Sequence, residues 1–173
     1  LYIEDLGFAR AQHPSMHPGR CAAVLLAGRQ IGVLGEVAEE VREAWDLAGP
    51  TYVAELDLDA LLAAASLQAR YRQLPRLPAA LRDLAVVVPD DDAHSAAALL
   101  AAVRAAGGEI LESVEVFDVY VDAERFGAGN RQVAMRLTFR LPERTLTDEE
   151  VDARMAAVIA HLDRELGAKV RSW

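Results

Sequence analysis

The order of the elements predicted after residue 81 constrains the fold of this chain more than any other feature. Runs of apolar β-forming residues predict four strands, at 82–89, 110–122, 131–142 and 168–171. Two amphipathic helices are predicted between them, at 90–108 and 145–167. Strand–helix–strand–strand–helix–strand is the split-βαβ order of ferredoxin-like sheets. We therefore expect an α+β fold in which two helices cover one face of a four-stranded antiparallel sheet.

Alternation along these strands predicts which side chains point away from the helices. The predicted core side chains are Leu84, Val86, Val88, Phe117, Val119, Val121, Val133, Met135, Leu137, Phe139 and Val170. The predicted free face carries Asp83, Ala85, Asp118, Tyr120, Gln132, Ala134, Arg136, Thr138, Arg140, Lys169 and Arg171. Its cations outnumber its carboxylates. We therefore expect a local excess of positive charge on a chain whose net charge is −9.

A flat basic face with an exposed aromatic is typical of a stacking platform for unpaired bases. Tyr120 can stack on one base, which contributes about 1–3 kcal/mol. Asp118 lies on the same face and can accept hydrogen bonds from base amino groups, as acidic side chains do from cytosine. Alternatively, the face is simply solvated, as one face of many antiparallel sheets is. The usual RNA-binding sheet motif, with several aromatics on two central strands, is absent.

The proline-containing stretch at 71–83 predicts a boundary between two domains, at 1–74 and 75–173. The first domain offers a hairpin at 21–37 with Gly28 and Arg29 at its turn, a short helix at 39–47 and a strand from residue 51. These elements are too few for a self-contained enzyme. The charged start without Met predicts a piece of a longer protein.

Five motifs run in order from residue 75 to residue 171: "LPAALRDLAVVV", "FDVY", "RQVAMRLTFR", "RTLTDEEV" and "GAKVR". Together they resemble the ferredoxin-fold anticodon-binding domain that ends the beta subunit of bacterial phenylalanyl-tRNA synthetases. Earlier in the chain, "HPGRCA", "GRQIGVLGEV" and "ELDLDALL" resemble the end of the catalytic-like domain of that subunit, which has a class II synthetase fold without an active site.

The resemblance implies that Tyr120 stacks on the first anticodon base and that Asp118 lies beside it. After the glycine turn, Arg131 keeps a family charge, and Gln132 stands where the family has a Ser that faces the tRNA. The expected tRNA-contacting residues are Tyr120, Asp118, Gln132, Arg131, Arg136, Arg140 and Arg171. The resemblance implies a whole enzyme that joins phenylalanine to its tRNA with ATP and Mg²⁺, as an α₂β₂ assembly with an alpha subunit. This chain alone is expected to hold no catalytic residue, metal or cofactor.

Two other functions fit the same order of elements. One is an ACT-type domain that senses a small amino acid. The other is an acylphosphatase-type hydrolase, which needs an anion-cradling loop after its first strand, where this chain has the phosphate-repelling "PDDDAH". The single cysteine, Cys21, indicates a reducing compartment, so a cytoplasmic location is expected. No membrane or DNA partner is expected.

Overall fold

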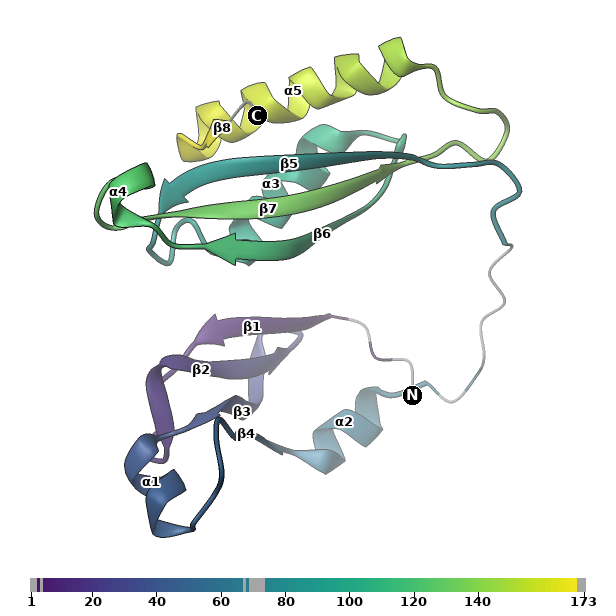
Figure 1. Cartoon of the computed structure of the whole chain (residues 1–173). Coiled ribbons are helices and arrows are strands. Elements are labelled where there is room, and N and C mark those ends of the chain that lie inside the picture. The colour runs from purple at the N-terminus through teal and green to yellow at the C-terminus, as the bar shows by residue number, and fades with distance from the viewer. Residues whose placement is uncertain (1–2, 4, 67, 69–73, 171–173) are drawn as a thin grey trace. The chain divides into compact units, whose positions relative to one another are not determined.

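The computed structural model describes residues 3, 5–66, 68 and 74–170, and the chain divides into two compact units, residues 1–72 and 73–173 (Figure 1). Both units are built around a four-stranded antiparallel sheet. In the first unit the strand order is β1-β2-β3-β4, a meander in which every strand pairs with its neighbour in sequence. In the second unit the order is β6-β7-β5-β8.

The elements of the first unit are β1 (Leu6–Arg10), β2 (Met16–Leu26), β3 (Arg29–Val37), α1 (Glu39–Ala44), β4 (Tyr52–Leu56) and α2 (Leu58–Ala64). The predicted hairpin is formed by β2 and β3. Its turn is Ala27–Gly28, because both residues have positive φ (47° and 78°), whereas Arg29 already pairs with Leu26. The predicted turn position was therefore one residue too late. The strand β1 was not predicted.

The elements of the second unit are β5 (Ala80–Pro89), α3 (Ala96–Gly107), β6 (Leu111–Tyr120), α4 (Ala123–Phe126), β7 (Asn130–Phe139), α5 (Asp148–Leu166) and β8 (Lys169–Val170). The predicted ferredoxin-like order is confirmed. The short helix α4 lies within the β6–β7 connection and was not predicted. Asp122 starts this helix, since its carboxylate accepts hydrogen bonds from the backbone N–H groups of Glu124 and Arg125, both at 3.0 Å.

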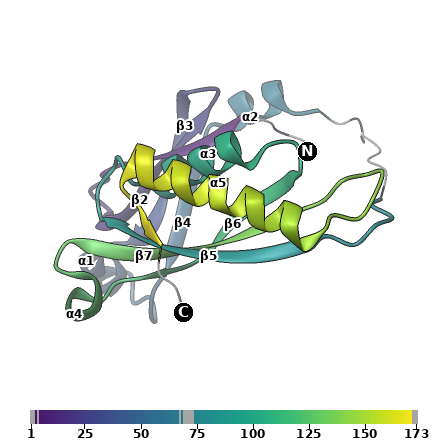
Figure 2. The same cartoon turned by 90° about the horizontal axis from the view of Figure 1, so that it is seen from above.

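The helices α3 and α5 lie across the same face of the second sheet, as the view in Figure 2 shows. Their apolar sides bury the alternate residues of the strands, and Val133, Met135, Leu137 and Phe139 of β7 are at most 1% exposed. A capping box begins α5: Thr147 accepts from the N–H of Glu150, and the Glu150 carboxylate accepts from the N–H of Thr147. The predicted covered face is thus confirmed for β5 and β7.

Candidate nucleic-acid interface

Strand pairing determines which side chains lie on the face of the second sheet opposite α3 and α5. Residues directly opposite each other in an antiparallel ladder share a face, and neighbours along a strand alternate. Because the odd-numbered residues from Val133 to Phe139 are buried under the helices, the even-numbered residues of β7 point the other way. We call this surface the open face: Asp83, Ala85 and Val87 of β5, Glu115, Phe117, Asp118 and Tyr120 of β6, and Gln132, Ala134, Arg136 and Thr138 of β7.

A β-bulge in β6 places two consecutive side chains on the open face. Val116 pairs with Met135 and Asp118 with Ala134, so Phe117 is the extra, unpaired residue. The ring of Phe117 lies beneath the guanidinium of Arg136, with Cζ 5.1 Å from the ring centroid, and is half exposed. The prediction that Phe117 belongs to the core is therefore wrong, because simple alternation assumes an unbroken ladder.

The predicted core positions at the ends of the strands are also more exposed than expected. Val119 lies on the helix-facing side opposite Val133, yet it is 48% exposed, because β6 is an edge strand that the helices only partly cover. Val121 lies beyond the end of β6 and is 65% exposed. Val170, on the edge strand β8, is 38% exposed. In the described structure, Leu111, Val114 and Val116 supply the contribution of β6 to the core.

Asp118, Tyr120 and Gln132 form a polar group at one end of the open face. Tyr120 lies directly opposite Gln132, and Asp118 lies two residues before it, opposite the small side chain of Ala134. The phenol hydroxyl of Tyr120 donates only a long bond of 3.5 Å to Asp122, and its ring meets Phe126 edge-on at 6.0 Å. No described residue makes a hydrogen bond or ion pair with the side chains of Asp118 or Gln132. These polar groups are therefore available to a ligand.

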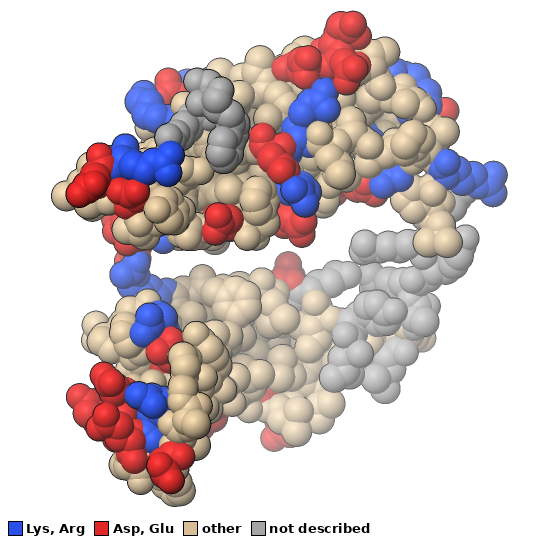
Figure 3. All heavy atoms as spheres, in the orientation of Figure 1, with Lys and Arg blue, Asp and Glu red and all other residues tan. Residues whose placement is uncertain are grey.

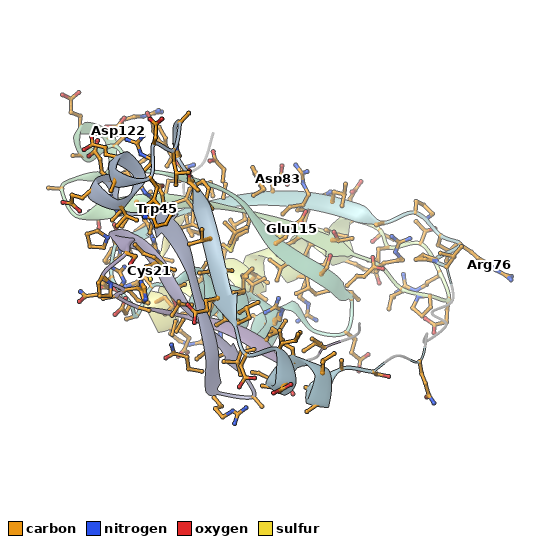
Figure 4. All side chains as sticks on the ribbon, turned by 90° about the horizontal axis from the view of Figure 1, so that it is seen from below. Cys21, Trp45, Arg76, Asp83, Glu115 and Asp122 are labelled. Atoms are coloured by element: carbon orange, nitrogen blue, oxygen red, sulfur yellow. The ribbon has the colours of Figure 1, made fainter. Side chains whose placement is uncertain are left out.

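Arg136, at the centre of the open face, is paired with Asp83 through two bonds of 2.8 Å, from Nε and Nη2 to the two carboxylate oxygens. The guanidinium lowers the pKa of Asp83, and the carboxylate raises the pKa of Arg136, with Glu115 adding to the latter effect. Asp83 and Glu115 lie opposite Arg136 on the two neighbouring strands, and Figure 4 labels both. The charge of this arginine is thus balanced within the sheet.

The other predicted cations are occupied by structural bonds. Arg131 contacts the loop after β5, with an ion pair to Asp90 at 3.1 Å and a bond to the carbonyl of His94 at 3.0 Å. Arg140 donates to Glu112 at 2.8 Å and to the carbonyl of Leu77 at 2.6 Å.

Lys169 pairs with Asp163 of α5 at 2.6 Å. Arg171 lies outside the described residues. Since each described cation has a carboxylate partner and Glu115 adds an acidic group, the predicted excess of positive charge is wrong for the described part of this face. Figure 3 likewise shows acidic and basic side chains interspersed over the second unit in that view.

The comparisons with known proteins agree with this architecture. The family model for the ferredoxin-fold anticodon binding domain matches residues 75–171, more than half of the chain. The chain belongs to this family. The model for the phenylalanyl tRNA synthetase beta chain CLM domain matches residues 1–58. The resemblance to phenylalanyl-tRNA synthetase beta subunits inferred from the sequence is therefore confirmed at 75–171 and at 1–58.

Curated relatives are similar along nearly the whole chain. The phenylalanine–tRNA ligase beta subunit of Symbiobacterium thermophilum is 47% identical over 99% of this chain, and those of Shouchella clausii and Clostridium tetani are 43% and 37% identical over 98% and 99%. The chain spans only about a fifth of the length of these relatives (19%, 20% and 21%).

The family match disfavours the two alternative functions. An acylphosphatase-type hydrolase would bind its substrate anion in the loop after β5. In this chain the backbone of that loop bonds to the carboxylate of Asp91 instead. Asp91 accepts from the N–H of His94 at 3.0 Å and lies 2.6 Å from the His94 ring, which lowers the pKa of Asp91.

None of the described helices is long and apolar enough to cross a membrane.

Proposed function

We propose that the open face of the ferredoxin-fold domain binds the anticodon loop of a tRNA. The observation that carries this proposal is the group Asp118, Tyr120 and Gln132, whose side chains share one uncovered face while their polar atoms remain available. Single-stranded loops are recognised by proteins through stacking on aromatics and hydrogen bonds to splayed-out bases. The family match at 75–171 supports the same ligand.

Each of the three side chains has a chemically distinct task in this proposal. Tyr120 stacks on an unpaired base, and its edge contact with Phe126 at 6.0 Å holds the ring in one orientation. The Asp118 carboxylate offers acceptor oxygens, so it selects base edges that present N–H groups. Gln132 offers both a donor and an acceptor, so it tolerates either kind of edge.

The arginines take a different part from the one expected from the sequence. Arg131 and Arg140 hold loops at the two ends of β7 through buried or half-buried bonds. We infer that they preserve the shape of the platform and do not contact phosphates directly. The predicted contact of Arg171 with the tRNA stays a prediction.

We further propose that the chain acts as part of a phenylalanine–tRNA ligase beta subunit, as the names of its relatives suggest. The whole enzyme would attach phenylalanine to its tRNA with ATP and Mg²⁺, in the cytoplasm, as an α₂β₂ assembly with the alpha subunit. In this proposal residues 1–74 belong to an inactive, class II synthetase-like domain, and residues 75–173 form the anticodon-binding domain. This chain alone would hold no ATP and perform no aminoacylation.

The test is a titration of the chain with the anticodon stem-loop of a phenylalanine tRNA at low salt, where phosphate attraction is little screened. Tyr120→Ala should weaken binding by about tenfold, because one base–aromatic stack is lost. Tyr52→Ala is the matched control, since Tyr52 is an exposed strand tyrosine of the first unit, and it should bind like the wild type. Equal affinity of both variants and the wild type would contradict the proposal.

A further inference from the structure

We infer that the open face has a second stacking plane, the guanidinium of Arg136 held between Asp83 and Phe117, which takes a further nucleobase of the same loop. This inference rests on the proposed function and extends it from one base to two. The first plane is the ring of Tyr120. The second is revealed by the bulge in β6, which moves Phe117 from the expected core onto the open face.

The guanidinium of Arg136 is held by contacts with two side chains, Asp83 and Phe117. Its two parallel bonds to Asp83, each 2.8 Å, hold it as a flat fork. Its Cζ lies over the Phe117 ring, 5.1 Å from the centroid, within the range of a cation–π contact. The side chain of Arg136 is nevertheless 43% exposed. A pre-organised planar group with an exposed surface can stack on a nucleobase with little further loss of side-chain entropy.

The charges around this plane favour a base over a phosphate. Asp83 neutralises the guanidinium, and the hydrogen bonds from Arg136 lower the pKa of Asp83. Glu115, opposite Arg136 on β6, adds a negative charge. A phosphate approaching Arg136 would therefore meet two carboxylates. A base carries no net charge, and its attraction to a planar guanidinium depends on stacking and cation–π contacts.

The distance between the two planes favours bases that are not stacked on each other. Tyr120 lies opposite Gln132, and Arg136 is four residues further along the unbulged strand β7, which corresponds to about 13 Å. Stacked bases are separated by only about 3.4 Å. The two planes therefore hold two bases that are not stacked on each other, as in single-stranded loops.

The experiment compares two variants of the plane with a matched control in the full chain. Phe117→Leu removes the ring, and the double variant Asp83→Asn with Arg136→Gln removes the flat cation while conserving net charge. The control is Arg20→Gln with Glu36→Gln, because this pair in the first unit has the same two-bonded geometry at 2.9 and 2.7 Å. The probe is the anticodon stem-loop of a phenylalanine tRNA, with 2-aminopurine at each loop position in turn.

Both plane variants should weaken binding by about fivefold or more, and the control should not. The 2-aminopurine signal that they change should lie at a different loop position from the one changed by Tyr120→Ala. The slope of log affinity against log salt should stay the same in the double variant. Loss of a phosphate contact would instead reduce the slope by about 0.7 to 0.9. Thermal unfolding of each variant establishes that it is folded.

The remaining outcomes separate the inference from the proposed function. If the wild type binds and Tyr120→Ala weakens it, but both plane variants bind like the control, there is no second plane and the proposed function stands. A reduced salt slope in the double variant would show that Arg136 contacts phosphate, which also overturns the inference. If the wild type itself does not bind the stem-loop, the proposed function and the inference fail together.

Discussion

The two sheets of this chain have the same number of strands and the same antiparallel pairing, yet they build very different cores. In the second unit the helices α3 and α5, of 12 and 19 residues, bury fourteen residues of the described chain in one cluster. In the first unit, α1 and α2 have 6 and 7 residues, and the described buried cluster is Val24, Ile31 and Ala60. What covers a sheet therefore decides how much of it becomes core.

Helix length explains much of this difference. A helix of 7 residues is about 10 Å long, whereas four strands span about 14 Å between the outer two, so a short helix leaves part of the sheet uncovered. The first unit accordingly keeps many large apolar side chains in contact with solvent. They are Leu6, Phe8, Leu34, Trp45, Leu47, Tyr52, Val53, Leu56, Leu58 and Leu62.

The comparison is tested most strongly by one substitution made in both sheets. Leu137 of β7 is fully buried, and Leu34 of β3 is 36% exposed, although both lie on inner strands. Leu137→Ala should lower the free energy of unfolding by about 2–5 kcal/mol, because it leaves a cavity. Leu34→Ala should cost clearly less, because water already reaches that side chain. Urea unfolding, with amide exchange to assign each sheet, measures both, and equal costs would refute the contrast.

A smaller effect is expected where the first sheet relies on close backbone approach. A Cβ on Gly32 of β3 would lie 2.1 Å from the carbonyl oxygen of Glu55, so Gly32→Ala must push β4 away. We expect a cost of about 1–3 kcal/mol, the usual range for overpacking.

Gly7→Ala is the control, because Gly7 also lies on a strand of this sheet and its nearest neighbour, Leu25 Cβ, would be 3.9 Å away. It should be nearly neutral in the same urea unfolding measurement. A neutral Gly32→Ala would mean that β4 shifts without cost, and hence that the β3–β4 pairing contributes little to stability.

The sequence predicted those features that depend on regular periodicity. The core positions Leu84, Val86 and Val88 and the order of the elements all follow from local patterns that the chain obeys. Phe117 could not be placed, because a bulge changes the face of a residue without any change in composition. Nothing in "FDVY" distinguishes a bulged from a regular ladder. The N-cap Asp122 could have revealed α4, since Asp before "AERF" is a helix start.

The sequence predicted which face carries the polar residues of the candidate site, but it did not predict the charge balance of that face. Asp118, Tyr120 and Gln132 were correctly assigned to the face opposite the helices, because alternation resumes after the bulge. Counting charges by face gave a positive surface, because that count ignores ion pairs whose partners come from other elements. Lys169 bonds to Asp163 of α5, and Arg140 to the carbonyl of Leu77, and neither partner is visible in strand alternation.

The smallest expected effect concerns how the helices of the two units begin. Glu150 of α5 accepts from Arg144 and from the N–H of Thr147, which lowers its pKa from 4.5 to about 2. The first helix, α1, begins at Ala38 without any side-chain cap.

Because the folded-state pKa of Glu150 lies below its unfolded value, its ionised carboxylate stabilises the fold above about pH 4.5, and this contribution fades as the pH falls towards 2. Glu150→Gln should therefore lower the unfolding midpoint slightly near neutral pH, and the difference from the wild type should shrink in acid. Melting curves from about pH 7 to pH 3 measure this difference, and a constant gap for Glu150→Gln would mean that its carboxylate charge does not stabilise α5.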